Sequence, residues 1–192
     1  MENKLSILIA IVIAFTSCNN NPGKDIAEKA DSANTANYDD NLKQEAAPVD
    51  KKSADFLVNA VSGGMTEMQL AKLAKEKTIS RNVKDYADMI VNDHGVLNDQ
   101  LQAISSGLHV VLKPPPNEEM QTKLQLLNKH KAKDFDKDFL DMMIKGHEKT
   151  IQLFEHASKD VNNAEVKTLI DNALPQLNKH LDSARVLKKM YK

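Results

Sequence analysis

Four ionisable side chains interrupt otherwise apolar stripes in this sequence, and each stands in a different segment. They are Glu67, His94, His147 and His180. Each has apolar or small residues three or four positions away on both sides, so the helical repeat predicts that it points into a core. Burying such a group is costly unless it finds a partner. Four of them therefore need a shared explanation, and a metal ion held by side chains from facing helices is a common one.

The chemistry of this set is that of a single metal ion. Three imidazoles and one carboxylate suit a transition metal, and the residue types do not choose among Zn, Cu, Ni and Fe. The alternative is a buried hydrogen-bonded network that fixes the register of the helices and holds no cofactor. The residues alone leave both hypotheses open.

Glycines gather beside three of these residues, Glu67, His94 and His147. Those concerned are Gly63, Gly64, Gly95 and Gly146. A glycine in a helix interior costs roughly 0.5–1 kcal/mol, so some gain should offset it. Close approach of the helices around a small central site would provide that gain.

The elements that must position these residues are helices. Alternating runs of β-branched and aromatic residues are nearly absent, which predicts an all-α protein. Apolar stripes predict four long helices over 53–78, 80–107, 134–159 and 162–192, and a short helix over 117–130. Ser80 and Asn162 are the expected N-caps of the second and fourth long helices, and Gly107 the expected end of the second. The proline run at 113–116 marks a long crossover, so the order predicts a ferritin-like four-helix bundle whose crossover carries the short helix.

The heights of the four residues along the bundle give a check. Glu67 and His94 lie 13 and 14 residues from a turn near Ser80, which places them at nearly the same height. His147 and His180 lie 14 and 19 residues from a turn near position 161. At about 1.5 Å per residue this second pair is offset by about 7 Å, which counts against a tight four-ligand site.

The N-terminal segment has the pattern of a targeting signal. A polar start is followed by an apolar run over 5–15, too short to span a membrane but typical of a signal peptide. It ends in Phe15-Thr16-Ser17-Cys18, which resembles the lipobox of bacterial lipoproteins. That resemblance implies a signal peptide over 1–18, lipidation of Cys18 and anchoring in the cell envelope, with the outer membrane favoured and the orientation toward periplasm or exterior left open. Residues 19–52 are poor in apolar residues and predict a flexible tether, which leaves 53–192 for the bundle.

Composition excludes several functions. The 26 Lys+Arg against 27 Asp+Glu and the absence of Trp exclude nucleic acid as a partner. A lone Cys excludes a disulfide framework and a thiolate zinc cluster. No nucleophile–base constellation and no phosphate-binding glycine loop occur, so an enzyme is not favoured. The partner that the sequence does indicate is the membrane, through Cys18, and no protein partner is identified.

The chain from about Asp55 to Tyr191 resembles a known family. The likeness is carried by the stretch 56–74 around Glu67, by 86–94 ending in Asp93-His94, by 135–148 ending in His147-Glu148, and by Leu174-Pro175-x4-His180-Leu181. The family is the ferritin-like bacterial envelope family called domain of unknown function 4142. The resemblance implies a four-helix ferritin-like bundle in the bacterial envelope, and it implies no established activity.

The wider ferritin-like group includes di-iron proteins, from which this chain departs. Such proteins use a Glu from each of two helices and Glu-x-x-His on the other two. Here Val91 and Leu177 stand three positions before His94 and His180, and His147 replaces the second lone Glu. The bridging carboxylates are mostly missing, so a di-iron oxidase is not favoured.

Overall fold

The computed structural model describes residues 49–112 and 118–191. The predicted signal segment 1–18, with Cys18, and most of the predicted tether lie outside the described residues. Within them the chain forms the helices α2 (Lys51–Lys77), α3 (Arg81–Gly107), α4 (Glu118–Asn128), α5 (Ala132–Asp160) and α6 (Ala164–Lys188), followed by the 3-10 turn η1 (Lys189–Tyr191). None of the helices in this described part has both the length and the apolar character needed to cross a membrane.

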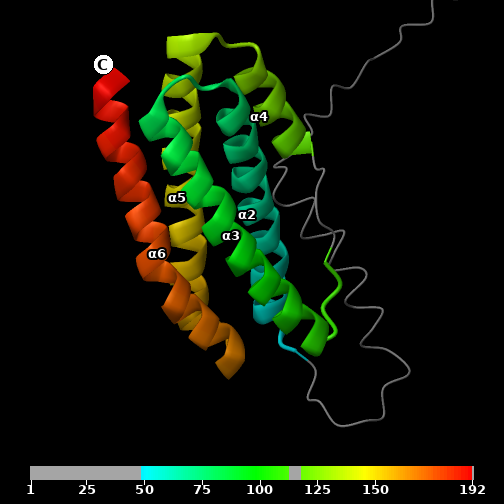
Figure 1. The fold of residues 1–192 in the computed structure, drawn as a ribbon. Coiled ribbons are helices and arrows are strands. Elements are labelled where there is room, and N and C mark those ends of the chain that lie inside the picture. The colour runs from blue at the N-terminus through cyan, green and yellow to red at the C-terminus, as the bar shows by residue number, and fades with distance from the viewer. Residues whose placement is uncertain (1–48, 113–117, 192) are drawn as a thin grey trace, which may run out of the picture.

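The four long helices form two antiparallel hairpins. α2 pairs with α3, and α5 pairs with α6 (Figure 1). The hairpins pack so that α2 contacts α5 and α3 contacts α6. α3 ends at one end of the bundle and α5 begins at the other, and the crossover between them carries α4, which packs on α2 and α5 (Figure 1). This is the predicted all-α, ferritin-like four-helix bundle with one long crossover.

Side-chain caps decide where most of the helices begin. The carboxylate of Asp50 accepts from the backbone N–H of Ser53, which starts α2 at Lys51, two residues earlier than predicted. Ser80 caps α3, and α3 ends at Gly107, as predicted. The predicted cap of α6 was wrong by one residue. Asn163, not its neighbour, accepts from the N–H groups of Glu165 and Val166.

The apolar core is divided into two clusters along the bundle axis. One contains the edge-to-face pair Phe56 and Phe154, whose ring centroids lie 4.9 Å apart. The other contains Tyr86 and Phe139, with centroids 6.1 Å apart. On α2, α3 and α5 the predicted ionisable residue falls in the sequence between residues of the two clusters, and on α6 His180 lies at the end of the first cluster, before Ala184 of the second. The polar layer therefore crosses the middle of the bundle and has apolar packing on both sides.

Candidate metal centre

All four predicted residues are buried, and each comes from a different long helix. Glu67 lies on α2, His94 on α3, His147 on α5 and His180 on α6, and none is more than 4% exposed. The other histidines stay apart from them. His156 is exposed on α5, and His109 lies after the end of α3.

The three imidazoles meet at the centre of the bundle. Their ring centroids form a nearly equilateral triangle with sides of 5.3, 5.3 and 5.4 Å. A ring nitrogen of each lies within 4.8 Å of a ring nitrogen of each of the others. The Nε2 atoms of His94 and His147 lie 3.3 Å apart.

Glu67 adds a carboxylate at one side of this triangle. Its Oε2 lies 3.3 Å from Nε2 of His94 and 3.8 Å from Nε2 of His147. Its Oε1 accepts a hydrogen bond of 3.2 Å from the hydroxyl of Thr150. The compact group consists of the three histidines alone, and Glu67 contacts two of them, so the four side chains do not form one equal set.

The hydrogen bond of His147 defines its tautomer. Its Nδ1 lies 2.9 Å from the backbone carbonyl of Met143, one turn earlier on α5. A carbonyl only accepts, so Nδ1 carries the proton and Nε2 keeps its lone pair. This lone pair is on the nitrogen that lies 3.3 Å from His94. A buried imidazole fixed in this way is ready to bind a metal through Nε2.

His180 is fixed by a residue that sequence reasoning did not single out. Its Nε2 lies 2.8 Å from the Oδ2 carboxylate oxygen of Asp93 on α3. Since a carboxylate accepts, Nε2 carries the proton and Nδ1 of His180 keeps the lone pair. The sequence signals for Asp93 were its place beside His94 and its occurrence in the stretch 86–94 that carries the family resemblance, and neither gave it a role in the centre.

Several buried polar atoms of the centre have no hydrogen-bond partner. They are Oε2 of Glu67, Nδ1 of His94 and Nδ1 of His180, and both polar side-chain atoms of Asn98 one turn further along α3. Buried polar atoms in folded proteins are nearly all paired, so each orphan calls for an explanation. The predicted alternative was a fully satisfied network, and these atoms leave it incomplete within the described residues.

Burial controls the charge of the centre. It lowers the pKa of His94 well below its usual range, and the neighbouring imidazoles of His147 and His180 lower that pKa further. Burial also lowers the pKa of His180, although the hydrogen bond to Asp93 opposes this shift. The pKa of Glu67 is raised by burial, against the opposing effects of His147 and Thr150. Neutral imidazoles keep a lone pair at neutral pH, which is the form that binds metals.

The predicted axial offset of about 7 Å between His147 and His180 does not separate their rings, whose centroids lie 5.4 Å apart, less than that offset. Counting residues locates Cα atoms, whereas side chains lean toward the N-terminus of their own helix. Because α5 and α6 are antiparallel, His147 leans away from the α5–α6 turn and His180 leans toward it. The two displacements act in opposite directions and offset the difference in Cα height.

Only two of the four glycines are needed for close packing around the centre. A Cβ at position 146 would lie 2.7 Å from Oε1 of Glu67, and one at position 64 would lie 2.7 Å from Oδ1 of Asn98. A Cβ at Gly63 would meet only an ordinary contact at 3.8 Å, and one at Gly95 would meet nothing within 4 Å. The glycine signal is therefore confirmed at Gly64 and Gly146 and wrong at Gly63 and Gly95.

The donor atoms fit the dimensions of a metal site. Zinc–imidazole bonds of about 2.0–2.1 Å in a tetrahedral arrangement place neighbouring donors roughly 3.3–3.4 Å apart. The contacts from Nε2 of His94 to Nε2 of His147 and to Oε2 of Glu67 are both 3.3 Å. Two edges of this triangle of donors thus have the spacing that one ion requires, and the third edge, from Nε2 of His147 to Oε2 of Glu67, is 3.8 Å.

The fold and this centre define a class: antiparallel four-helix bundles with a buried histidine cluster at mid-height. The chain belongs to the family described as a domain of unknown function (DUF4142), whose model matches residues 40–187. A comparison with curated proteins finds no match.

Two solved structures share the fold. The crystal structure of a DUF305 fragment from Deinococcus radiodurans has a TM-score of 0.68 and 14% identity, covering 75% of this chain and 99% of that one. CopM in its Cu(II)-bound form has a TM-score of 0.63 and 14% identity, covering 73% of this chain and 97% of that one. At such identities the likeness concerns the arrangement of the helices.

Proposed function

We propose that the domain binds one transition-metal ion between His94, His147 and His180, with Glu67 as an anionic ligand. The observation that carries the proposal is the convergence of three buried imidazoles, whose ring nitrogens lie within 4.8 Å of one another. Neutral imidazoles with a carboxylate suit zinc, copper, nickel and iron. When bound, the ion would give the centre a Lewis-acidic cation in a dry environment.

The orphaned atoms favour this proposal over a purely structural network. Nδ1 of His180 is a buried nitrogen without a hydrogen-bond partner, and Oε2 of Glu67 has only its contacts of 3.3 and 3.8 Å with the imidazoles of His94 and His147. An ion would satisfy such atoms. The described Cu(II)-bound state of CopM, a protein with the same arrangement of helices, makes Cu(II) a reasonable first ion to test. Zn(II) is the second, because the 3.3 Å spacings suit its tetrahedral preference.

The test is metal content. We expect the full chain, made without an affinity tag and purified in mild detergent, to retain about one equivalent of Cu(II) or Zn(II) by mass spectrometry. The double variant His94→Ala/His147→Ala should lose it. The matched control His109→Ala/His156→Ala removes the same number of imidazoles away from the centre and should keep it.

Two outcomes would contradict the proposal. One is equal metal content in both double variants, which would place the ion elsewhere. The other is wild-type protein that takes up neither ion and melts at the same temperature with and without a chelator. That second result would favour the buried network as the role of these side chains.

We also propose that the chain is a lipoprotein anchored in the bacterial envelope through Cys18, with the outer membrane as its location. The support is the apolar run over 5–15 followed by the lipobox-like Phe15-Thr16-Ser17-Cys18. In cells fed labelled palmitate, the chain should become labelled and sediment with outer membranes. Cys18→Ser should abolish both, and label that persists in this variant would contradict the proposal.

A further inference from the structure

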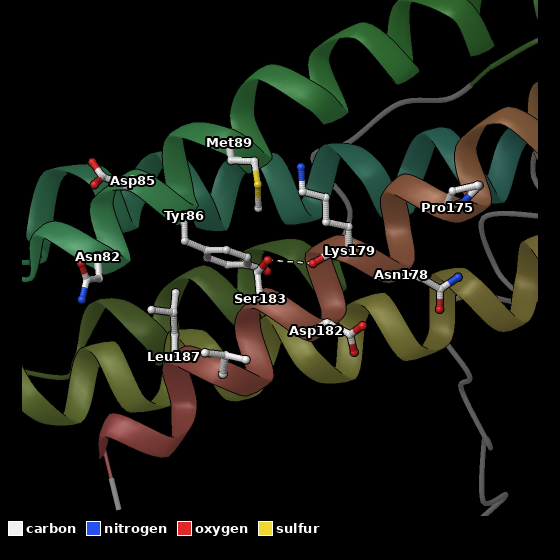
Figure 2. A pocket seen from close by; sticks show the side chains of 11 residues that line it. Asn82, Asp85, Tyr86, Met89, Pro175, Asn178, Lys179, Asp182, Ser183 and Leu187 are labelled. Carbon is white, nitrogen blue, oxygen red and sulfur yellow. Dashed lines mark hydrogen bonds between the residues drawn. The ribbon is translucent and has the colours of Figure 1, made fainter.

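At the α3–α6 seam a partly exposed side chain contacts the buried centre. α3 and α6 run antiparallel there: Asn82 contacts Met190 at one end, and Asp93 contacts His180 further along. A groove of about 790 Å³ follows this seam. Its lining includes Tyr86 from α3 and residues of α6 from Leu187 back to Pro175, as Figure 2 shows.

The Asp93–His180 pair lies beside that groove, although neither residue is part of its lining. Met89, one turn before Asp93, and Lys179, next to His180, both line it. The side chain of Asp93 is 31% exposed, whereas that of His180 is 2% exposed. Asp93 is therefore a hydrogen-bonding neighbour of the centre that also reaches water.

We propose that Asp93 is a positioning residue for the metal centre, and that it acts by fixing the tautomer and orientation of His180. The carboxylate accepts from Nε2 of His180 at 2.8 Å, which holds the proton on that nitrogen. Nδ1, buried and without a partner, is then the nitrogen of His180 that is available to an ion. Carboxylates that orient metal-binding histidines in this way raise the basicity of the imidazole and the affinity of the site. This inference rests on the proposed function.

A second carboxylate of the same helix provides a matched control. Asp85 lies on α3, lines the same groove and is two-thirds exposed, and its described ion pair is with Arg81 at 3.9 Å. Asp93→Ala and Asp85→Ala therefore remove the same charge from the same seam, but only the first removes a contact with the centre. Loss of helical circular dichroism in either variant would be detected before any binding is measured.

The first measurement needs no metal. In full chain labelled with ¹⁵N-histidine, the signals of His180 are identified by their loss in His180→Gln. We expect wild type and Asp85→Ala to show His180 protonated on Nε2, and Asp93→Ala to lose this single tautomer. Asp93→Glu, which keeps a carboxylate acceptor, should restore it in part. A His180 tautomer that is unchanged in Asp93→Ala would overturn the proposal.

The second measurement is the affinity for Cu(II) and Zn(II) in separate titrations. We expect Asp93→Ala to bind about 10–100-fold more weakly than wild type, and Asp85→Ala to stay within about twofold. If both variants lost metal affinity equally, the loss would come from removing a negative charge near the groove, and the positioning role of Asp93 would be overturned. If wild type binds neither ion, the proposed function fails and the metal role of Asp93 fails with it, while the tautomer still decides whether Asp93 orients His180.

Discussion

Two glycines lie next to histidines of the centre, one on α3 and one on α5, and their surroundings differ. Gly146 precedes His147 and lies against the carboxylate of Glu67, so its missing Cβ leaves space that the site uses. Gly95 follows His94 and faces open space. The two positions look alike in the sequence. What separates them is the identity of the side chain that the folded bundle places opposite each one.

These glycines make a paired prediction. Gly95→Ala should raise the free energy of unfolding by about 0.5–1 kcal/mol, because alanine is the better helix former and nothing obstructs its methyl group. Gly146→Ala should show no such gain, because the new Cβ displaces Glu67 and weakens its hydrogen bond from Thr150, which contributes about 0.5–1.5 kcal/mol. Urea denaturation of both variants without metal checks this. Equal stabilisation by the two substitutions would show that Glu67 moves aside at no cost.

At the scale of single residues, the sequence predicted which ionisable side chains are buried but not which side chains contact them. An ionisable residue within an apolar stripe is visible in the helical repeat, so all four buried residues could be named. Asp93 and Thr150 contact the cluster from positions that carry no such signal. Their role depends on the rotation of one helix against another, which the repeat within a single helix does not encode.

Helix starts were predictable to within two residues because capping is local chemistry. The last helix was wrong at its other end: it was predicted to run to 192, but α6 ends at Lys188 and a 3-10 turn follows. Ser80 was identified correctly from its place before an apolar stripe. At α6 two asparagines stand side by side, and the predicted cap fell on Asn162 because Glu165 follows it by three residues. In the structure Asn163 is the cap, and the N–H of Glu165 itself is one of the groups that it satisfies. Two adjacent residues of the same type give the local pattern no means of choosing.

Substituting each asparagine in turn shows which of the two caps α6. Asn163→Ala should lower the free energy of unfolding by about 1 kcal/mol, because the N–H groups of Glu165 and Val166 lose their acceptor. Asn162→Ala should change it by less than about 0.5 kcal/mol, because this exposed side chain does not cap the helix. Chemical denaturation measures both. A larger loss at position 162 would move the start of α6 back to the sequence-based assignment.

At the scale of the whole molecule, the position of the centre inside the core makes the stability of the fold depend on pH. The polar layer lies between two apolar clusters, so its imidazoles lose water on both sides when the bundle forms. The fold class was predictable because loop lengths and stripes set the topology. The height at which His147 and His180 meet was not, because it depends on the lean of side chains on antiparallel helices.

This burial predicts that the metal-free protein loses stability as the pH falls from about 7 to 5. The pKa of His94 and that of His180 are lowered in the fold, so both stay neutral there at a pH where the unfolded chain, with a histidine pKa of about 6.5, already takes up protons. Their contribution to stability is therefore complete above about pH 6.5 and declines below it, by at most about 1.4 kcal/mol per pH unit for each group. The pKa of Glu67 is raised, so this carboxyl group acts in the opposite direction at lower pH. Comparison of variants that all keep Glu67 isolates the effect of the histidines.

The comparison uses urea denaturation with a chelator present, at steps from pH 7 to 5. His94→Gln/His180→Gln removes both lowered pKa values while keeping polar side chains of similar size, so its midpoint should depend less on pH than that of wild type. His109→Gln/His156→Gln, outside the centre, should follow the wild-type slope. Identical slopes in all three proteins would mean that His94 and His180 take up protons over the same pH range in the folded and the unfolded chain, which contradicts their lowered pKa values. Histidines with unshifted pKa values would be protonated below about pH 6.5 in the fold and would then bind a cation weakly, so this titration also bears on the metal proposal.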